Sequence, residues 1–358
     1  MISQSNFDRR LGRLSNEIWS KLAQIEALKG QWVGSVNLSP QILGRLKRSV
    51  LITSAGASTR IEGAALSDAD VEKLMRGLSV QKFKDRDKQE VRGYFRLLSN
   101  VFDAWSHTHL SESMIKHFHK ELLKYVDKDE RHRGDYKKVE NRVEMRDAAG
   151  KTLAVVFATT PAYLTPKAMQ ELMEWTRAAL AQKKYPALLV IGHFVVEFLK
   201  IHPFQDGNGR LSRVLTNLMM LKASYGFMPY VSQEKLIEDR KTAYYVALRA
   251  SQKTMGSRKE DISAWLNFFL DLILEQSRLA MDLLTQDQPE KTMSVHQLNV
   301  WRVLQNMGEA SAGDIVRRSK VGRPTVNQVL TKLLRLKKIE RLGLGRSTRY
   351  RVLTVIER

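Results

Sequence analysis

The sequence predicts a mainly α-helical protein with one β-hairpin and a separate basic module at the C-terminus. Apolar residues recur at steps of three and four along most of the chain, which indicates amphipathic helices. This period breaks between residues 134 and 161, where two short strand-like runs predict the hairpin. The balance of charge shifts after residue 284, which sets the C-terminal module apart. A length of 358 residues fits two or three domains, because a single hydrophobic core seldom serves so long a chain.

Composition limits the classes of protein to which the chain can belong. It contains no cysteine, which excludes disulfide frameworks and thiolate zinc sites. The N-terminal residues lack the apolar core of a signal peptide, and no later run is long and apolar enough to span a bilayer. We therefore expect a cytoplasmic protein with no membrane partner. The formal net charge of +21 indicates an acidic partner.

The first part of the chain, residues 1–108, is predicted to be helical. One apolar stripe that ends at Gly30 predicts the first helix. The stripe consists of Phe7, Leu11, Leu14, Ile18, Leu22, Ile25 and Leu28. Ser39 followed by Pro40 is typical of an N-cap and a first helical turn, so a second helix is predicted from there to Gly63.

Four histidines in the next helical stretch invite a metal-binding interpretation. They are His107, His109, His117 and His119. The members of each pair are two residues apart and cannot both face the same way on a helix. We therefore interpret them as surface or packing residues.

The stretch richest in reactive groups runs from His202 to Arg213 and reads His-Pro-Phe-Gln-Asp-Gly-Asn-Gly-Arg-Leu-Ser-Arg. Residues 186–201 before it are apolar on nearly every side, as expected of a helix in the centre of a domain. Gly207 and Gly209 allow backbone conformations in which consecutive N–H groups form a concave seat for an anion. A helix that begins near Asn208 would add partial positive charge at the same place.

Four more residues of this loop suit a phosphate-bearing ligand. Arg210 and Arg213 are three apart on the predicted helix, so their guanidinium groups share a face and can grip phosphate oxygens. Asp206 is the nearby group able to hold a hard divalent cation, which would be magnesium if phosphates share it. His202 has an ordinary pKa near neutrality, which suits a general base.

These residues resemble the signature loop of the Fic family, His-Pro-Phe-x-Asp-Gly-Asn-Gly-Arg-x-x-Arg, at every fixed position. The resemblance implies a Fic-type helical core over residues 109–284. It also implies transfer of AMP from ATP to a Ser, Thr or Tyr hydroxyl of a target protein or of the protein itself, with His202 as the base and Mg²⁺ on Asp206. The residues implied in nucleotide binding are Gly207, Asn208, Gly209, Arg210 and Arg213. One of Tyr244 and Tyr245 is implied to border the adenine, although an aromatic pair at helical spacing is usually part of a core.

Residues 58–63, Ser-Thr-Arg-Ile-Glu-Gly, resemble the inhibitory motif of the same family, Ser/Thr-x-x-x-Glu-Gly/Asn. Ser58 and Glu62 are four apart and share a helix face. Taken without the loop, they would be interpreted as a helix end with a solvated glutamate. The resemblance implies that Glu62 pairs with Arg213 and fills the space of the γ-phosphate, because a carboxylate and a phosphate compete for the same guanidinium.

The predicted hairpin spans residues 134–161, with a turn at residues 147–150. An edge decoration without a role is one interpretation. The resemblance implies instead a flap that clamps the target protein, since a strand edge offers unpaired backbone groups to an extended segment. The contact residues would be Val155, Val156 and Phe157.

The C-terminal module is predicted to be a winged helix-turn-helix over residues 294–358, after a polar linker at residues 285–293. Three helices and two strands are expected in it. Residues 291–358 hold 15 Lys and Arg against 4 Asp and Glu, an excess of +11 that favours DNA as a partner. The candidate contacts are Thr325, Asn327, Gln328, Lys332, Arg346 and Arg349. Protein contacts or a homodimer are the alternative for this module.

Two hypotheses from different classes follow. In the first, the protein is a magnesium-dependent protein adenylyltransferase restrained by Glu62. In the second, it is a DNA-binding regulator whose Fic-like core senses nucleotide. The presence of both His202 and Asp206 favours the first.

Overall fold

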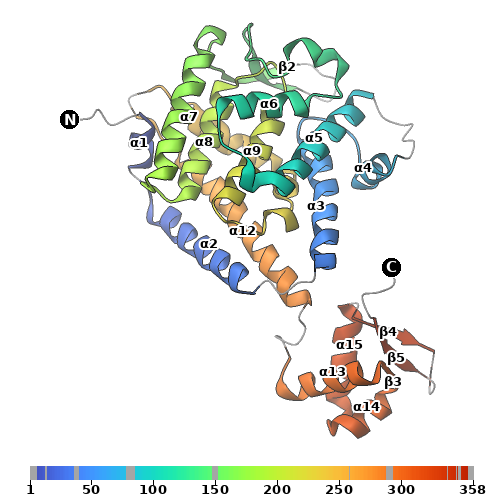
Figure 1. The fold of residues 1–358 in the computed structure, drawn as a ribbon. Coiled ribbons are helices and arrows are strands. Elements are labelled where there is room, and N and C mark those ends of the chain that lie inside the picture. Colours follow the sequence, from blue (N-terminus) through green and yellow to red (C-terminus); the bar gives the residue numbers. More distant parts are fainter. Residues whose placement is uncertain are drawn as a thin grey trace. The chain divides into compact units, whose positions relative to one another are not determined.

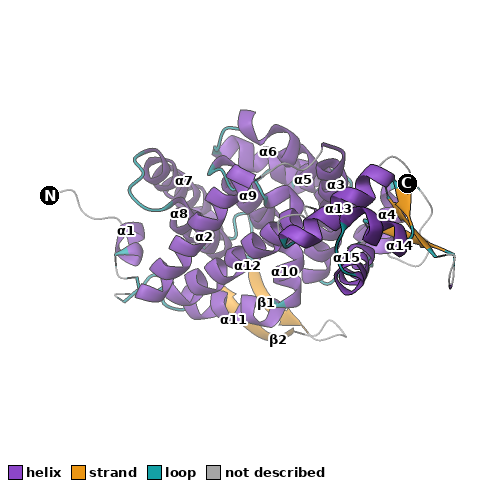
Figure 2. Cartoon of the chain, turned by 90° about the horizontal axis from the view of Figure 1, so that it is seen from below, coloured by secondary structure: helices purple, strands orange, loops and turns teal. Residues whose placement is uncertain are grey.

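A computed structural model describes residues 6–12, 14–35, 40–77, 85–146, 152–257, 259–287, 293–336, 338–343, 345 and 348–353. The chain divides into two compact units, Met1–Ala280 and Met281–Arg358. Both units are built mainly from helices, as Figures 1 and 2 show. Within the described residues, no helix has the combination of length and apolar character needed to cross a bilayer.

The first unit contains two short strands among its helices. The strands are β1 (Arg142–Arg146) and β2 (Thr152–Ala158). The helices are α1 (Asn6–Leu11), α2 (Asn16–Ser35), α3 (Pro40–Ile61), α4 (Asp68–Met75), α5 (Asp85–Ala104), α6 (Glu112–Leu122), α7 (Thr165–Ala181), α8 (Ala187–Ile201), α9 (Asn208–Lys222), α10 (Gln233–Asp239), α11 (Lys241–Gln252) and α12 (Ser263–Asp287). Short 3₁₀ helices lie at Trp105–His107, Asp127–His132, Ala162–Leu164 and Met228–Tyr230.

Helices α8 and α9 form the centre of the first unit and pack against each other (Figure 1). Every residue of α8 is buried except Ala187, Glu197 and Lys200. Each large apolar side chain buried in this way contributes roughly 1.5–3 kcal/mol to stability. The apolar helix predicted before the loop is thus confirmed, and its end fixes where the loop begins.

The first predicted helix is wrong in its extent. The structure has two helices there, α1 and α2, and α2 runs through Gly30 to Ser35. Trp32 near its end is buried, stacks on Tyr230 with ring centroids 5.6 Å apart, and meets Phe227 edge on. These contacts keep the chain helical beyond a glycine that would otherwise favour a helix end.

The predicted hairpin is confirmed as an antiparallel pair of β1 and β2, with Arg142 opposite Ala158 and Val143 opposite Phe157. The register is irregular in two places along β1, which indicates bulges. The predicted turn at residues 147–150 lies outside the described residues. Only the backbone is described for the three predicted target contacts, Val155, Val156 and Phe157.

Three helices and a three-stranded antiparallel sheet form the second unit. The elements are α13 (Val295–Met307), β3 (Glu309–Ala310), α14 (Ala312–Ser319), α15 (Arg323–Arg335), β4 (Ile339–Leu342) and β5 (Arg349–Val352), with strand order β3, β5, β4. Ser294 and Ser311 start α13 and α14 with capping boxes. The three helices and the two longer strands match the sequence prediction. Strand β3 was not predicted, because two residues are too few to show an alternating pattern.

Candidate active site

The loop between α8 and α9 begins with a strained residue. His202 ends α8 with φ 52° and ψ 61°, a left-handed conformation that is unfavourable for a residue with a β-carbon. Its N–H still donates to the carbonyl oxygen of Phe198 at 2.9 Å. Phe204 follows with a fully buried ring that anchors the loop. The strain at His202 is therefore held in place by packing on both sides.

Asn208 closes the loop on itself. Its side-chain oxygen accepts the N–H of Phe204 at 2.9 Å, and its amide nitrogen donates to the carbonyl oxygen of Phe204 at 2.7 Å. Asn208 is only 1% exposed. The side chain was predicted to contact the nucleotide; the structure instead shows an amide whose oxygen and nitrogen are both engaged by the loop backbone. Asn208 shapes the loop, and its own N–H is the group left for a ligand.

Two glycines make room for an anion at the start of α9. Gly207 has φ 78° and stands as the N-cap residue of the helix. The first N–H groups of a helix have no partner inside it, so they favour an anion at this end. A β-carbon built on Gly209 would lie 2.4 Å from the Oε1 atom of Glu62, so any larger residue would displace that carboxylate. The predicted anion seat thus has a carboxylate lying directly against it.

The same carboxylate forms an ion pair with Arg213. The Arg213 Nη2 atom donates to Glu62 Oε1 at 2.8 Å and to the carbonyl oxygen of Ser58 at 2.9 Å, and its Nε donates to Ser58 Oγ at 2.8 Å. Arg213 is buried while Glu62 keeps a third of its side chain exposed. Burial is the largest influence and opposes the charge of Arg213, but Glu62, Tyr244 and Tyr94 together outweigh it and raise the pKa of the guanidinium. Ser58 and Glu62 from α3 and the turn after it therefore hold the second arginine of the loop.

Arg210 does not share the environment of Arg213. It is 2% exposed and forms ion pairs with Glu90 at 2.8 Å and Asp206 at 3.2 Å. Arg210 and Arg213 thus lie three residues apart on α9 with different ion-pair partners, and their joint contact with phosphate stays a prediction. The partner Glu90 lies on α5, far away in the sequence, so spacing within the loop could not reveal it.

Asp206 lies at the edge of the anion seat with its side chain 38% exposed. Its Oδ1 accepts from the N–H of Gly207 at 2.5 Å and from Arg210, and its Oδ2 accepts from Arg86 at 2.5 Å. Burial alone would raise the pKa of Asp206, but Arg210, the Gly207 N–H and Arg86 together hold it below its usual value. A reachable, ionised carboxylate beside a phosphate seat fits Mg²⁺, which commonly takes one protein carboxylate and completes its shell from phosphates and water.

His202 is held as a neutral base. Burial is the largest cause that lowers its pKa, to about 4, and the positive charge of Lys137 acts in the same direction. Its Nδ1 lies 3.3 Å from the carbonyl oxygen of Leu199. Because a carbonyl oxygen can only accept, this contact puts the proton on Nδ1 and leaves a lone pair on Nε2. Nε2 is therefore the atom that can take a proton.

Residues 109–220 match the family model described as Fic/DOC family. The chain contains a Fic domain. It is 26% identical over 173 residues to a probable protein adenylyltransferase of Aquifex aeolicus, an alignment that covers 44% of this chain and 53% of the relative. It is 40% identical over 80 residues to a Fido domain-containing protein of Dictyostelium discoideum, covering 20% of this chain and 52% of the relative. The chain thus spans about half the length of these curated relatives.

Solved structures of Fic proteins resemble the fold of this chain. A Fic family protein from Desulfovibrio desulfuricans has a TM-score of 0.63 and 24% identity, and the match covers 97% of this chain and 98% of that one. At this level of identity the likeness establishes a common fold.

Two residues that sequence reasoning did not assign to the site support the loop of the Fic domain. Lys137 is 4% exposed; its Nζ donates to Asn141, Thr159 and the carbonyl oxygen of Ile201, and its N–H donates to Pro203 at 2.8 Å. Burial lowers the pKa of Lys137 to about 8. It ties both ends of the hairpin to the chain that leads into the loop.

His119 supports the loop from the opposite side. Its Nδ1 accepts the N–H of Gly134 at 2.9 Å, so Nε2 carries the proton and donates to the carbonyl oxygen of Asp206 at 3.0 Å. Its ring stacks on Phe204 with centroids 3.9 Å apart. His119 shares a helix face with the buried residues Ile115 and Leu122, and that spacing was the available signal.

The two tyrosines differ in position. Tyr244 is 3% exposed and packs edge on against Trp265, so it belongs to the core. Tyr245 is partly exposed, and the nearby Glu62 carboxylate adds to the effect of burial in raising the pKa of its hydroxyl. Both hydroxyls lie near Arg213 and Glu62, so which of the two tyrosines borders a nucleotide stays a prediction.

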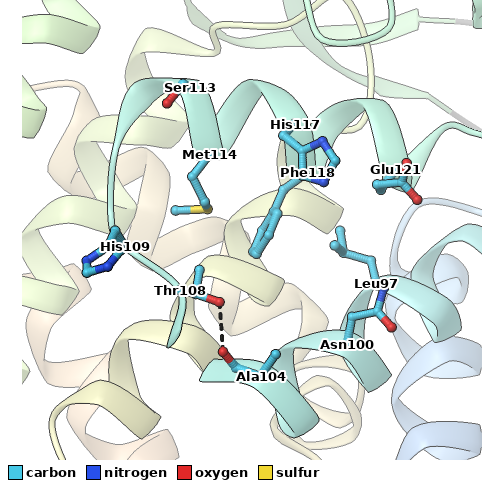
Figure 3. Close-up of a pocket in the computed structure, with 10 residues that line it drawn as sticks. All are labelled: Leu97, Asn100, Ala104, Thr108, His109, Ser113, Met114, His117, Phe118 and Glu121. Atoms are coloured by element: carbon cyan, nitrogen blue, oxygen red, sulfur yellow. Dashed lines mark hydrogen bonds between the residues drawn. The ribbon is translucent and has the colours of Figure 1, made fainter. Parts of the chain in front are cut away.

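A separate pocket of about 490 Å³ lies between α5 and α6 (Figure 3). Leu97, Met114 and Phe118 are among its lining residues, and His117 lines it as well. None of its lining residues belongs to the loop, so this pocket is distinct from the candidate active site.

We expect Asn208→Ala to lower the free energy of unfolding by about 1–3 kcal/mol, because it leaves the buried N–H of Phe204 without its acceptor. It also removes one of two side-chain donors to the carbonyl oxygen of Phe204, the other being Asn141. Thermal unfolding would measure the change. Asn100→Ala, at an exposed position on α5, serves as the matched control and should leave stability within about 0.5 kcal/mol of the parent. Equal effects of the two substitutions would contradict the structural role of Asn208.

Proposed function

We propose that this protein is an adenylyltransferase that moves AMP from ATP to a hydroxyl group of a target protein, and that Glu62 restrains it. The observation that carries the proposal is the position of the Glu62 carboxylate, against Gly209 and in contact with Arg213. A carboxylate at that point behaves as a stand-in for a phosphate, because both are anions that bind helix N-terminal N–H groups and guanidinium. The name of the Aquifex relative supports the reaction class.

The chemistry requires a base, an anion seat and a cation. Nε2 of His202 would take the proton of the target hydroxyl as its oxygen attacks the α-phosphorus of ATP, and the bond from that phosphorus to the bridging oxygen would break to release pyrophosphate. The N–H groups of Asn208 and Gly209 would stabilise the phosphate oxygens. Mg²⁺ held by Asp206 would supply positive charge to the triphosphate.

Restraint by Glu62 follows from competition for one guanidinium. A γ-phosphate could bind Arg213 only by replacing the Glu62 carboxylate, whose Oε1 lies 2.8 Å from Arg213 Nη2. The end of α3, directly before this carboxylate, is held by ion pairs of Arg60 with Glu238 at 2.5 Å and Asp68 at 2.9 Å. Glu62 is therefore costly to displace, and nucleotide that binds beside it would be held in poor geometry for attack.

The target would be positioned by the hairpin. A strand edge can pair with an extended segment of another protein through backbone hydrogen bonds and be tolerant of its sequence. The contacts with that segment are assigned to Val155, Val156 and Phe157 on β2. A hydroxyl of a second copy of this chain would be an acceptor of the same kind, so self-modification belongs to the proposal.

Glu62→Gly is expected to raise transfer of labelled AMP by at least about tenfold, because one charge-assisted hydrogen bond of roughly 1.5–3 kcal/mol no longer competes with the γ-phosphate. Transfer from α-³²P-ATP to the protein or to a lysate would measure it. Adding His202→Ala should abolish labelling while nucleotide binding persists. A Glu62→Gly protein no more active than wild type would refute the restraint, and undiminished labelling without His202 would refute the base.

The pH dependence follows from the depressed pKa of His202. Its pKa lies at about 4, below the usual value, so the base is neutral and competent above that value and loses activity only as pH falls through it. We expect transfer by the Glu62→Gly protein to stay nearly constant from about pH 6 to 8. A rate that rises about fourfold between these values, as an ordinary histidine with a pKa near 6.5 would require, would count against this environment.

Exposed polar residues on α15 of the second unit support a second proposed function, the binding of nucleic acid by a winged helix. Asn327 and Gln328 on α15 are exposed between buried residues, and Thr325 is partly exposed. Lys332 is also partly exposed, while Arg346 lies outside the described residues. Arg349 pairs with Glu309 at 2.9 Å, so it is a weaker candidate for phosphate than predicted.

Duplex DNA should bind the full chain and lose about tenfold or more in affinity between about 50 and 200 mM salt, since released counterions oppose binding. Fluorescence anisotropy would measure both values. Arg323→Gln, at an exposed position that begins α15, should weaken binding, whereas Arg76→Gln on α4 removes one exposed charge elsewhere and should not. No binding at about 50 mM salt would leave protein contact as the role of this unit.

A further inference from the structure

Arg86 makes an ion pair with the carboxylate that the proposed function reserves for a cation. It lies in the first turn of α5, and its Nη2 is 2.5 Å from Asp206 Oδ2. Asp206 Oδ1 already receives the Gly207 N–H and Arg210. Both oxygens of this carboxylate are therefore engaged by donors of the chain itself.

We propose that Arg86 is an internal competitor of the divalent cation: it neutralises Asp206 before Mg²⁺·nucleotide binds, and then moves to Asp129. The inference rests on the proposed function, because it assigns Asp206 to that cation. It adds a residue, Arg86, that controls how tightly the cation is held.

Competition follows from the geometry of the carboxylate. A cation bound to Oδ2 takes the position at which the Arg86 guanidinium stands, since both must lie within bonding distance of the same oxygen. Arg210 adds a second guanidinium within 3.2 Å of Oδ1. If a divalent ion bound Asp206 while Arg86 and Arg210 stayed in place, three positive groups would surround one carboxylate. Their mutual repulsion favours the departure of whichever arginine is free to move. Arg210 is buried, whereas the Arg86 side chain is 43% exposed.

Asp129 provides the place to which Arg86 can move. Its Oδ2 lies 3.6 Å from Arg86 Nη2, too far for a hydrogen bond, and it is buried without a hydrogen-bond donor among the described residues. Its other oxygen is 3.1 Å from Nε2 of His132. A buried carboxylate oxygen without a donor is costly, so it favours the arrival of one. A short rotation of the guanidinium would supply it.

Glu90 makes this movement a local one. Its Oε1 accepts from Arg86 Nε at 2.8 Å, and its Oε2 lies 2.8 Å from Arg210 Nη1. The Nε contact can persist while the Nη atoms turn from Asp206 to Asp129. The helix need not shift, and the positive charge of Arg86 stays close to a carboxylate throughout.

The test measures Mn²⁺ binding by electron paramagnetic resonance in the presence of a saturating non-hydrolysable ATP analogue. All proteins carry Glu62→Gly, so that the nucleotide seat is open. Arg86→Gln should tighten Mn²⁺ binding roughly threefold to tenfold, as expected for the loss of a partly exposed ion pair. Asp129→Asn should weaken it, because Arg86 loses its second partner. Arg76→Gln, which removes an exposed arginine paired with Glu72, should leave it unchanged.

Opposite effects of Arg86→Gln and Asp129→Asn are the decisive result, because partial unfolding would weaken binding in both. Unchanged or weaker Mn²⁺ binding in Arg86→Gln would overturn the inference. So would weaker binding of the analogue to Arg86→Gln in the presence of a chelator, which would make Arg86 a phosphate ligand. A parent protein that binds neither the analogue nor Mn²⁺ would overturn the proposed function itself, so the two failures are distinguishable.

Discussion

The contact of buried Arg213 with the last turn of α3 and the turn that follows it is the interaction on which the site depends. A guanidinium inside the protein needs acceptors, and Ser58 and Glu62 supply three hydrogen bonds to it. Through that requirement the N-terminal helix α3 is bound to the central helix α9. The anion seat, the ion pair and the position of Glu62 are thus parts of one arrangement, and none can change without leaving charge unpaired.

The loop itself is held by its neighbours before any ligand arrives. Asn208 closes it from within, His119 supports the carbonyl oxygen of Asp206, and Lys137 holds the chain just before Phe204. This support offsets the unfavourable backbone of His202, whose left-handed conformation turns the chain sharply at the end of α8. A site built in this way is preorganised, so little ordering remains to be done when substrate binds.

Sequence reasoning found what is encoded in short stretches. The loop motif identified the family, the apolar run identified α8, and resemblance pointed to the pairing of Glu62 with Arg213. It did not find the ion pair of Arg210 with Glu90, nor the inward turn of the Asn208 amide, because these depend on which segments meet in three dimensions. The continuation of α2 through Gly30 was missed for the same reason. The helix is stabilised there by the stacking of Trp32 on Tyr230, a residue distant in the sequence.

The position of Glu62 one residue beyond the last residue of α3 has a consequence for how the proposed restraint can evolve. Its N–H is bonded to Thr59 in the closing turn, and Gly63 then leads the chain away with φ 106°. The side chain that lies against the seat is thus attached just beyond the helix, outside the hydrophobic contacts that hold α3 in place. Selection can alter that tip, and with it the proposed restraint, without disturbing the hydrophobic contacts of α3, although buried Arg213 then loses its counter-ion. Related sequences can therefore differ in basal activity while they keep the same apolar core.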